Sequence, residues 1–125
     1  MIELLESAKD VIACRVSDEV TGKDLELVMD RIDEAMAGEG KVHMFVETIS
    51  IQRIEMEGLP AHIQRAMPLL AKLNRFGRIA VVADQAWVRL GTRVESALLP
   101  FVSYQVFFPE QRDEALAWVE GRAAG

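Results

Sequence analysis

The chain has 125 residues, half of them hydrophobic and 27% charged, which is the composition of one globular domain, residues 1–125, with enough apolar material for a core. Its net charge of −6 argues against a nucleic-acid partner, because proteins that bind nucleic acid usually carry a basic face. No apolar run approaches the ~20 residues that cross a bilayer, so we expect no membrane span.

The first predicted elements are two short strands. Apolar residues dominate Ile2–Glu6 and Val11–Val16, and Ser7–Asp10 between them is a short polar connection. This pattern predicts a hairpin, and hence an antiparallel pair at the start of the sheet. Ser17–Gly22 is expected to be a loop.

A helix is predicted next. Thr21 and Asp24 have the spacing of a capping box, with Asp in place of the usual Glu, and Gly38 and Gly40 mark the end of the helix. The apolar residues between these signals recur at helical spacing, and they are Leu25, Val28, Met29, Ile32 and Met36. Acidic residues cover the remainder of this helix, which indicates a face turned to solvent.

Lys41–Thr48 is the next predicted strand, and its two faces differ in character. One face carries Val42, Met44 and Val46, and the other carries His43, Phe45 and Glu47. One face of the sheet is therefore expected to be open at this strand, or to serve as a binding surface. Ser50–Leu59 is mixed in character and is predicted to be irregular.

A second helix and a central strand are predicted in the middle of the chain. The helix starts near Pro60, and Pro68 inside it predicts a kink or two abutting helices. The run Ile79–Ala83 is apolar on both faces, which is typical of a parallel strand that is covered on both sides. Asp84 follows at once as a helix N-cap, so this strand leads directly into a third helix.

The last predicted elements are a strand at Tyr104–Phe108 and a helix at Pro109–Gly121. The order β-β-α-β-α-β-α-β-α predicts an α/β fold with a mostly parallel five-stranded sheet and a first antiparallel strand. If consecutive strands are neighbours, right-handed crossovers place the helices mainly on one face. The other face would be covered by a partner, by the segment 50–59, or by nothing. With Phe45 on that face, we expect a two-fold homodimer.

Several separated stretches agree in order and spacing with one known family. They are MIELLE, TGKD and GKVHMFVE in the first half, and the more specific RIAVVADQAWVR and VFFPEQRDEALAWV in the second. These stretches resemble the SpoIIAA-like family of small bacterial proteins, which is grouped with STAS and Sec14-type (CRAL-TRIO) domains. The resemblance covers nearly the whole chain. The resemblance implies a STAS-like fold. It implies less about function, because most members have no assigned activity.

The best-known STAS proteins are anti-sigma-factor antagonists that are switched by phosphorylation of a serine in a D-x-S-G motif after the third strand. Here that place reads ETISIQ, residues 47–52, without such a motif. Ser50 is therefore only a weak phosphosite candidate, and the family's switch is not carried over to it.

No catalytic set, cofactor or metal site is predicted. His43 and His62 lie on different elements without the spacing of metal ligands, and P-loop, G-x-G-x-x-G and G-x-S-x-G patterns are absent. The single cysteine, Cys14, lies in an apolar strand and is expected to be a small buried thiol. We therefore expect that the protein is not an enzyme.

A binding site is expected at the edge of the sheet where the parallel strands end, because ligands of open α/β sheets bind there and helix N-termini favour anionic groups. This edge gathers residues 48–50, 84–87 and 109–110. The candidate binding residues are Trp87 and two arginines from the basic middle of the chain, Arg53 and Arg89. The competing interpretation is that Trp87 belongs to the core and Arg89 to a solvated surface.

The expected function is a non-catalytic regulatory or protein-interaction module of the STAS-like type, with an unknown protein partner. The alternative is a carrier or sensor of a small apolar ligand or lipid, as in Sec14-type domains. The first ten residues carry acids where a signal peptide would carry bases, so a cytoplasmic location is expected.

Overall fold

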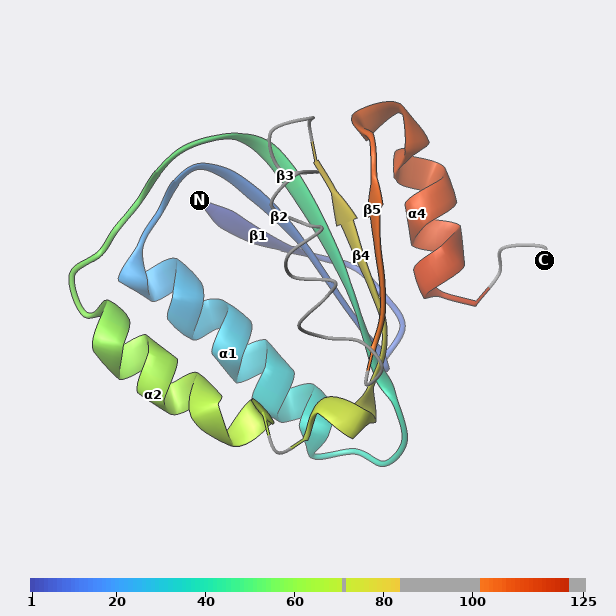
Figure 1. Ribbon diagram of the computed structural model, residues 1–125, viewed down its shortest axis with the longest axis horizontal. Coiled ribbons are helices and arrows are strands. Elements are labelled where there is room, and N and C mark those ends of the chain that lie inside the picture. The colour runs from blue at the N-terminus through green and yellow to red at the C-terminus, as the bar shows by residue number, and fades with distance from the viewer. Residues whose placement is uncertain (71, 84–101, 122–125) are drawn as a thin grey trace.

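The computed structural model describes residues 1–70, 72–83 and 102–121, and these residues build one five-stranded sheet with helices on both of its faces (Figure 1). The first two strands, β1 (Ile2–Leu5) and β2 (Val11–Val20), are antiparallel, as their polar connection predicts. The other strands are β3 (Val42–Ile54), β4 (Phe76–Val82) and β5 (Ser103–Phe107).

The strands stand in the sheet in the order of the sequence, β1-β2-β3-β4-β5. All neighbouring pairs after the first are parallel, which confirms the predicted mixed sheet. In β4 the two faces are both apolar and both covered. Ala80 and Val82 pack on one side, and Ile79 packs against the cluster on the other. This strand is therefore an interior strand of the sheet, as its uninterrupted apolar run predicts.

Helix α1 (Gly22–Met36) begins at the predicted capping box. The backbone N–H of Asp24 donates to Thr21 Oγ1 at 3.3 Å, and the backbone N–H of Thr21 donates to the Asp24 carboxylate at 2.9 Å. The other end is satisfied by a residue far along the chain. Arg75, in the short 3₁₀ helix η1 (Leu73–Arg75), donates to the carbonyl oxygens of Met36 and Gly38 at 2.9 and 2.8 Å. Both ends of α1 thus have partners for their free backbone groups.

Helices α1 and α2 (Leu59–Leu70) lie on one face of the sheet, and α4 (Arg112–Val119) lies on the other (Figure 1). In the described part of the chain, most helices are thus on one face, but α4 covers the opposite face over β3. Phe45 is 0% exposed beneath α4, and the Arg112 guanidinium lies 5.6 Å from its ring centroid. The expectation that Phe45 offers an uncovered surface for a homodimer is therefore wrong. A helix after the last strand has no crossover to complete, so handedness does not restrict its face.

The second difference is a longer ribbon of β2 and β3. Both strands run past the sheet, with Ser17–Val20 paired against Ile49–Ile54, where a loop and an irregular segment are predicted. The pairing shifts register at Asp18, whose φ is 53°, and Ser50 has a φ of 45°. Such bulges increase local twist, and the ribbon bends over the helices of the α1 side (Figure 1).

The remaining helices follow the prediction in part. Pro68 lies inside α2, which ends two residues later, and η1 follows it. The predicted last helix starts with a 3₁₀ turn, η2 (Pro109–Gln111), and continues as α4. The predicted third helix, with Trp87 and Arg89, falls outside the described residues.

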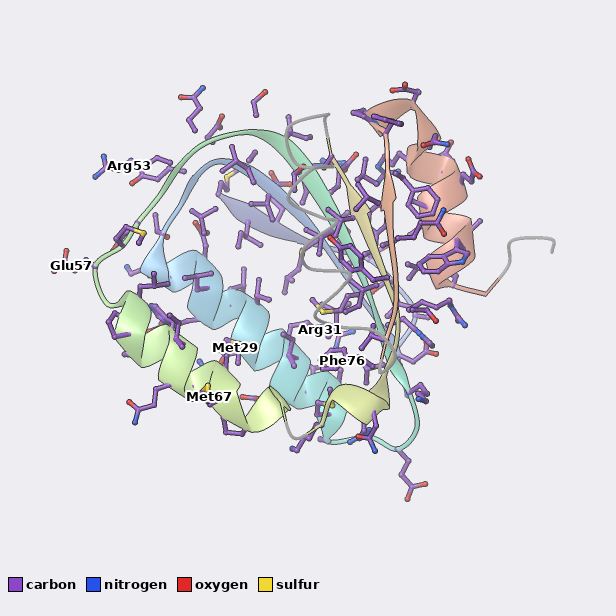
Figure 2. All side chains as sticks on the ribbon, in the orientation of Figure 1. Met29, Arg31, Arg53, Glu57, Met67 and Phe76 are labelled. Atoms are coloured by element: carbon purple, nitrogen blue, oxygen red, sulfur yellow. The ribbon has the colours of Figure 1, made fainter. Side chains whose placement is uncertain are left out.

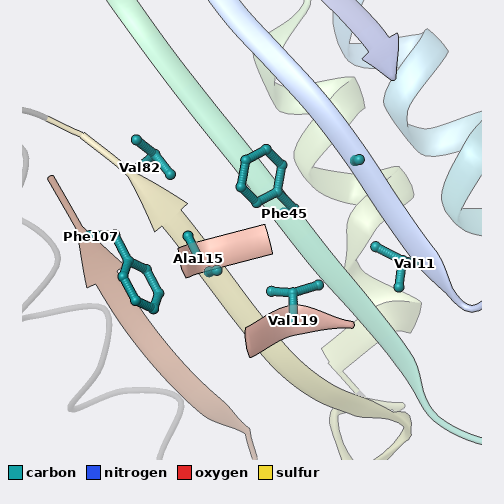
Figure 3. Packing of buried hydrophobic residues seen from close by; sticks show 8 residues of the cluster. Val11, Phe45, Val82, Phe107, Ala115 and Val119 are labelled. Carbon is teal, nitrogen blue, oxygen red and sulfur yellow. The ribbon is translucent and has the colours of Figure 1, made fainter. Parts of the chain in front are cut away.

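The two largest apolar clusters lie on opposite sides of the sheet, and a third, smaller one contains Ile2, Cys14 and Val20. Figure 3 shows the one beneath α4, made of Val11, Ala13, Phe45, Ala80, Val82, Phe107, Ala115 and Val119. The one beneath α1 contains Ile12, Met29, Ile32, Met36, Val42, Phe76 and Val102. Residues of β2 and β3 alternate between the two sides with a period of two. In β4 the alternation is interrupted between Phe76 and Ile79, where the pairing with β3 shifts register.

Helix α4 is held to the sheet at both ends by arginines. At its start Arg112 Nε lies 2.8 Å from the Glu47 carboxylate, and at its end Arg78 Nε donates to the Val119 carbonyl at 3.1 Å. The same Arg78 donates its backbone N–H to His43 Nδ1 at 2.9 Å. The polar contacts of α4 are therefore anchored on β3 and β4.

Candidate functional site

A hollow of about 300 Å³ lies where β3 separates from β4 and where η2 begins. We call it the strand-end hollow, and its lining residues are Glu47, Thr48, Ile49, Ser50, Val82 and Pro109. The sequence predicts that residues 48–50 and 109–110 gather at this edge, and the structure brings Thr48–Ser50 and Pro109 together in it. Residues 84–87, the third predicted part of the edge, lie outside the described residues.

The floor of the strand-end hollow carries a carboxylate between two guanidinium groups. Glu47 is 8% exposed, and its Oε1 and Oε2 lie 2.8 Å from the Nε atoms of Arg15 and Arg112 respectively. Burial alone would raise the pKa of Glu47, but the contacts with Arg15 and Arg112 outweigh it and lower the pKa below its usual value. Glu47 therefore stays ionised, and both its oxygens are engaged by cations.

The rim of the strand-end hollow is partly apolar and exposed. Ile49 is 45% exposed, and Phe108, which directly precedes η2, is 39% exposed. Thr48 is turned inward, because its hydroxyl donates to the Val82 carbonyl at 2.8 Å. Ser50 is exposed and holds a left-handed backbone conformation. The hollow thus combines a charged floor with one exposed apolar side chain in its lining, Ile49, and a second exposed apolar side chain, Phe108, next to Pro109 in the chain.

A second site, which the sequence does not predict, is an apolar cavity of about 330 Å³ between the sheet and the two helices α1 and α2. We call it the inter-helix cavity. Its walls come from β1, β2, β3, α1 and α2, among them Cys14, Val28, Met44, Val46, Leu59 and Ala66. Each of these residues reads in the sequence as an ordinary core position, and no local pattern shows that the two helices stand far enough from the sheet to leave a space.

Two lining residues give this cavity its chemistry. Cys14 is 2% exposed, and burial raises the pKa of its thiol to about 11, so the thiol stays protonated, as expected of a buried structural cysteine. His62, on α2, is the one lining residue with a strongly polar side chain. The cavity therefore suits an aliphatic group far better than a charged one.

Helix α2 forms one wall of the inter-helix cavity and is tied to α1 by a charged fork. The Nη2 atom of Arg65 lies 2.7 Å from Asp30 Oδ1 and 3.0 Å from Asp33 Oδ2. The acids of α1 are predicted to be a solvated face, and Asp30 and Asp33 are indeed mostly exposed. They nevertheless fasten the outer helix over the cavity.

The arginines and histidines chosen from the sequence do not converge on one site. Arg53 lies on the β3 extension, with a side chain 75% exposed and its Nε 3.9 Å from Glu19 Oε1, and Figure 2 places it near the far end of the ribbon. Trp87 and Arg89 fall outside the described residues. His43 is buried against Gly77 and Arg78, on the opposite side of the sheet from His62.

Within residues 1–70, 72–83 and 102–121, no cluster of three or more His, Cys, Asp or Glu has the arrangement of a metal site. No helix in this described part is long and apolar enough to cross a membrane. The arrangement of the two sites favours binding. Both oxygens of Glu47 are engaged by arginines, and the lining of the cavity is almost wholly apolar.

Comparison with known proteins assigns the fold. A family model described as SpoIIAA-like matches residues 11–120. An uncharacterised protein of Shewanella loihica PV-4 with a SpoIIAA-like fold is similar over 95% of this chain and 92% of its own, with a TM-score of 0.63 and 20% identity. The phosphorylated form of SpoIIAA, a cell fate determinant of Bacillus, is similar over 91% of this chain and 97% of its own, with a TM-score of 0.54 and 15% identity. Comparison with curated proteins gives no match.

Proposed function

The chain belongs to the SpoIIAA-like family, and on this premise we propose that it is a non-catalytic regulatory module that binds a protein partner at the strand-end hollow. The structural neighbour from Bacillus, a cell fate determinant, supports a regulatory role by analogy of fold. The proposed binding surface is the part of the sheet edge that the structure describes. We propose Trp87 and Arg89 as further contact residues at this edge.

The observation that carries this proposal is an exposed apolar side chain, Ile49, in the lining of a hollow whose floor is held by ion pairs. Ile49, which lines the hollow, and Phe108, which precedes the lining residue Pro109 in the chain, are both more than one-third exposed, and the hollow has a volume of about 300 Å³. Protein interfaces concentrate their energy where an apolar anchor enters such a pocket and water is excluded around it. The fixed Arg15–Glu47–Arg112 floor keeps the pocket preformed, which reduces the entropy lost on binding.

The proposal assigns no phosphorylation to Ser50. The residue is exposed at the strand-end hollow, but it lies inside the β3 extension at a φ of 45° and not at the start of a helix.

The test compares two aspartate variants at exposed apolar positions. Ile49→Asp places a charge at the rim of the hollow, whereas Leu27→Asp changes a side chain of similar exposure, 41%, on α1. In quantitative affinity capture from the source cells, we expect one or more proteins to be enriched on the wild-type chain and on Leu27→Asp, and depleted at least tenfold on Ile49→Asp. Equal recovery on Ile49→Asp, with an unchanged thermal melt, would remove the hollow from the interface.

A second candidate function is the carriage or sensing of a small apolar ligand, and the inter-helix cavity favours it. At about 30 Å³ per water-sized group, a volume of 330 Å³ holds an alkyl chain of roughly ten carbons. A diacyl lipid exceeds this volume, so the ligand would have to be a single short chain or a small ring system.

Cys14 supplies a built-in reporter for this candidate, because it lines the cavity and is the single cysteine of the chain. We expect decanol or a similar single-chain compound to slow the reaction of Cys14 with a small thiol reagent. Ala66→Leu, which fills the cavity from α2, should abolish the protection, whereas Ala61→Leu on the exposed side of the same helix should keep it. Protection that survives Ala66→Leu would place the ligand elsewhere.

A further inference from the structure

We propose that Arg15 and Arg112, which Glu47 holds side by side, form a binding site for a phosphate group on the protein partner. This inference rests on the proposed function, because the phosphate would belong to the segment that binds at the strand-end hollow. It adds the chemical class of that segment, which is a side chain with a phosphate monoester next to an apolar residue.

Glu47 holds the two guanidinium groups by their inner nitrogens. Its Oε1 accepts a hydrogen bond from Arg15 Nε at 2.8 Å, and its Oε2 lies 2.8 Å from Arg112 Nε. Phe45 also supports Arg112, whose guanidinium carbon lies 5.6 Å from the centroid of the Phe45 ring. Since both contacts end on one carboxylate, the two cations are neighbours, although one comes from β2 and the other from the start of α4.

The terminal nitrogens of both guanidinium groups remain for a ligand. In residues 1–70, 72–83 and 102–121, the Nη atoms of Arg15 and Arg112 make no hydrogen bond. Among the side chains of these residues that are not exposed, Arg112 Nε is the one buried nitrogen or oxygen without a hydrogen bond, so the Nη atoms reach solvent. The side chains are 34% and 33% exposed. The site therefore presents two positioned cations with accessible N–H groups.

A phosphate monoester matches these donors better than a carboxylate does. It carries a charge of about −1.5 to −2 near pH 7 and three strong acceptor oxygens, so it can accept from both guanidinium groups at once. Arginine binds phosphate oxygens in pairs through its planar fork, which lysine cannot do. A carboxylate has a single charge and two oxygens, and we expect it to bind the same donors more weakly.

Ile49 provides an apolar contact beside the phosphate site. It lies two residues after Glu47 in β3, so its side chain is on the same face of the strand, roughly 7 Å along it. It is 45% exposed and lines the strand-end hollow. A partner segment can therefore place a phosphorylated residue over the two arginines and a neighbouring apolar residue against Ile49. Recognition of phosphorylated segments by arginine clusters is a recurring mode of peptide binding.

Two acids lie near the outer nitrogens and compete with a phosphate. Asp113 Oδ1 lies 3.7 Å from Arg112 Nη1, and Glu3 is the cross-strand neighbour of Arg15. Both acids are exposed, so they can turn away from the arginines without a loss of packing. Their removal should therefore tighten phosphate binding, which is a result that a purely structural role of the arginines does not give.

The first test titrates the isotope-labelled chain with phenyl phosphate, which joins a phosphate monoester to an apolar ring, and follows the arginine Nε–H signals by NMR. We expect saturable shifts of the Arg15 and Arg112 signals and a Kd at least fivefold lower than that for benzoate. Arg15→Gln should raise the Kd for phenyl phosphate at least fivefold. Arg65→Gln is the control, since Arg65 has a similar exposure, 37%, and is also held by acids, and it should leave the Kd within twofold. Equal Kd values for phenyl phosphate and benzoate, or a Kd that Arg15→Gln does not change, would overturn the proposal.

The second test uses variants that leave the arginines and their support in place. Asp113→Asn and Glu3→Gln should each lower the Kd for phenyl phosphate by roughly 1.4- to 5-fold, since each removes a competing exposed pair that contributes about 0.2–1 kcal/mol. Both positions are exposed, so the thermal melt should not change. Kd values that stay the same or rise in both variants would contradict the site.

The last test separates this inference from the proposed function. Affinity capture is repeated after the lysate of the source cells is treated with a phosphatase. We expect the protein whose recovery depends on Ile49 to be depleted at least tenfold by this treatment, and to be depleted on Arg15→Gln without it. Unchanged recovery after the treatment would overturn the phosphate site and leave the strand-end hollow as an interface. If no protein depends on Ile49, the proposed function fails, and the binding of phenyl phosphate decides this inference by itself.

Discussion

His43 shows how one buried polar side chain fixes the geometry of two strands. Its Nδ1 accepts the backbone N–H of Arg78 at 2.9 Å, and a Cβ on Gly77 would lie 2.2 Å from its Cε1. Glycine is thus required at position 77 by the close approach of the imidazole ring. The sequence suggests a structural histidine, but the ring's dependence on Gly77 comes from a contact between β3 and β4 that no local pattern contains.

The protonation of His43 should make the protein less stable in acid. Burial, and next the positive charge of Arg78, lower the pKa of His43 below 6.5, against a smaller opposing effect of Asp10. Because the unfolded chain binds the proton more tightly, stability is kept above about pH 6.5 and is lost as the pH falls through the lowered pKa.

His43→Asn tests this, since the asparagine oxygen can replace Nδ1 as the acceptor for Arg78 but cannot titrate. We expect the free energy of unfolding in urea to fall less between pH 7.5 and 5.5 for His43→Asn than for the wild-type chain. An equal fall in both proteins would assign the pH dependence to other groups.

Gly77→Ala should be destabilising because the new methyl group meets the His43 ring. Overpacking of this kind typically costs about 1–3 kcal/mol. In a His43→Ala background the same change should cost less, because the ring is gone. A double-mutant cycle measured by urea unfolding checks this, and purely additive effects would show that Gly77 is needed for its backbone and not for the ring.

At the scale of elements, α4 is the part whose position the sequence leaves open. The alternation of side chains along β3 predicts two different faces for this strand. The structure confirms them, with Met44 and Val46 at the inter-helix cavity and Phe45 beneath α4. The face on which α4 lies is decided by contacts made far along the chain, among them Arg112 with Glu47 and Arg78 with the Val119 carbonyl. The two residues of each contact are far apart in the sequence. No local sequence pattern therefore predicts the face on which α4 lies.

Glu47→Gln should loosen the start of α4. The change removes the charge that holds Arg15 by a hydrogen bond and Arg112 by an ion pair, and a hydrogen bond to a charged group contributes about 1.5–3 kcal/mol. We expect a loss of about 2 kcal/mol in urea unfolding and faster amide exchange in the first turn of α4. Glu3→Gln, which removes the exposed acid opposite Arg15 on β1, is the control and should cost far less. Equal losses of unfolding free energy in both variants would argue that Glu47 does not hold the start of α4.

The Arg65 fork should control entry to the inter-helix cavity. Arg65→Gln removes both contacts between α2 and the acids of α1, so α2 should open more often and expose Cys14. Exposed ion pairs contribute about 0.2–1 kcal/mol each, so we expect Cys14 to react with a thiol reagent roughly two- to thirty-fold faster. High salt should have the same effect on the wild-type chain. Arg53→Gln, at a cation 75% exposed on the ribbon, should leave the rate unchanged. A rate that Arg65→Gln does not alter would show that α2 is held by packing alone.

At the scale of the whole molecule, the order and direction of the strands are predictable because apolar runs and turn signals are local. The extension of β2 and β3 is not, since Ser17–Val20 and Ile49–Ile54 are polar or mixed and pair across a long separation in sequence. The strand-end hollow is predictable in outline, because the ends of parallel strands meet at one edge. Its charged floor is not, because Arg15, Glu47 and Arg112 come from three elements that only the folded chain brings together.

The most direct test of the account is site-specific photo-crosslinking in living source cells. A photoreactive amino acid at position 49 stands at the rim of the strand-end hollow, and one at position 27 stands at similar exposure on α1. We expect the chain labelled at position 49 to form a discrete covalent adduct with one protein of different sequence, and the chain labelled at position 27 to form none with that protein. Adducts of equal yield at both positions, or no adduct at position 49, would contradict a regulatory module that binds through the strand-end hollow.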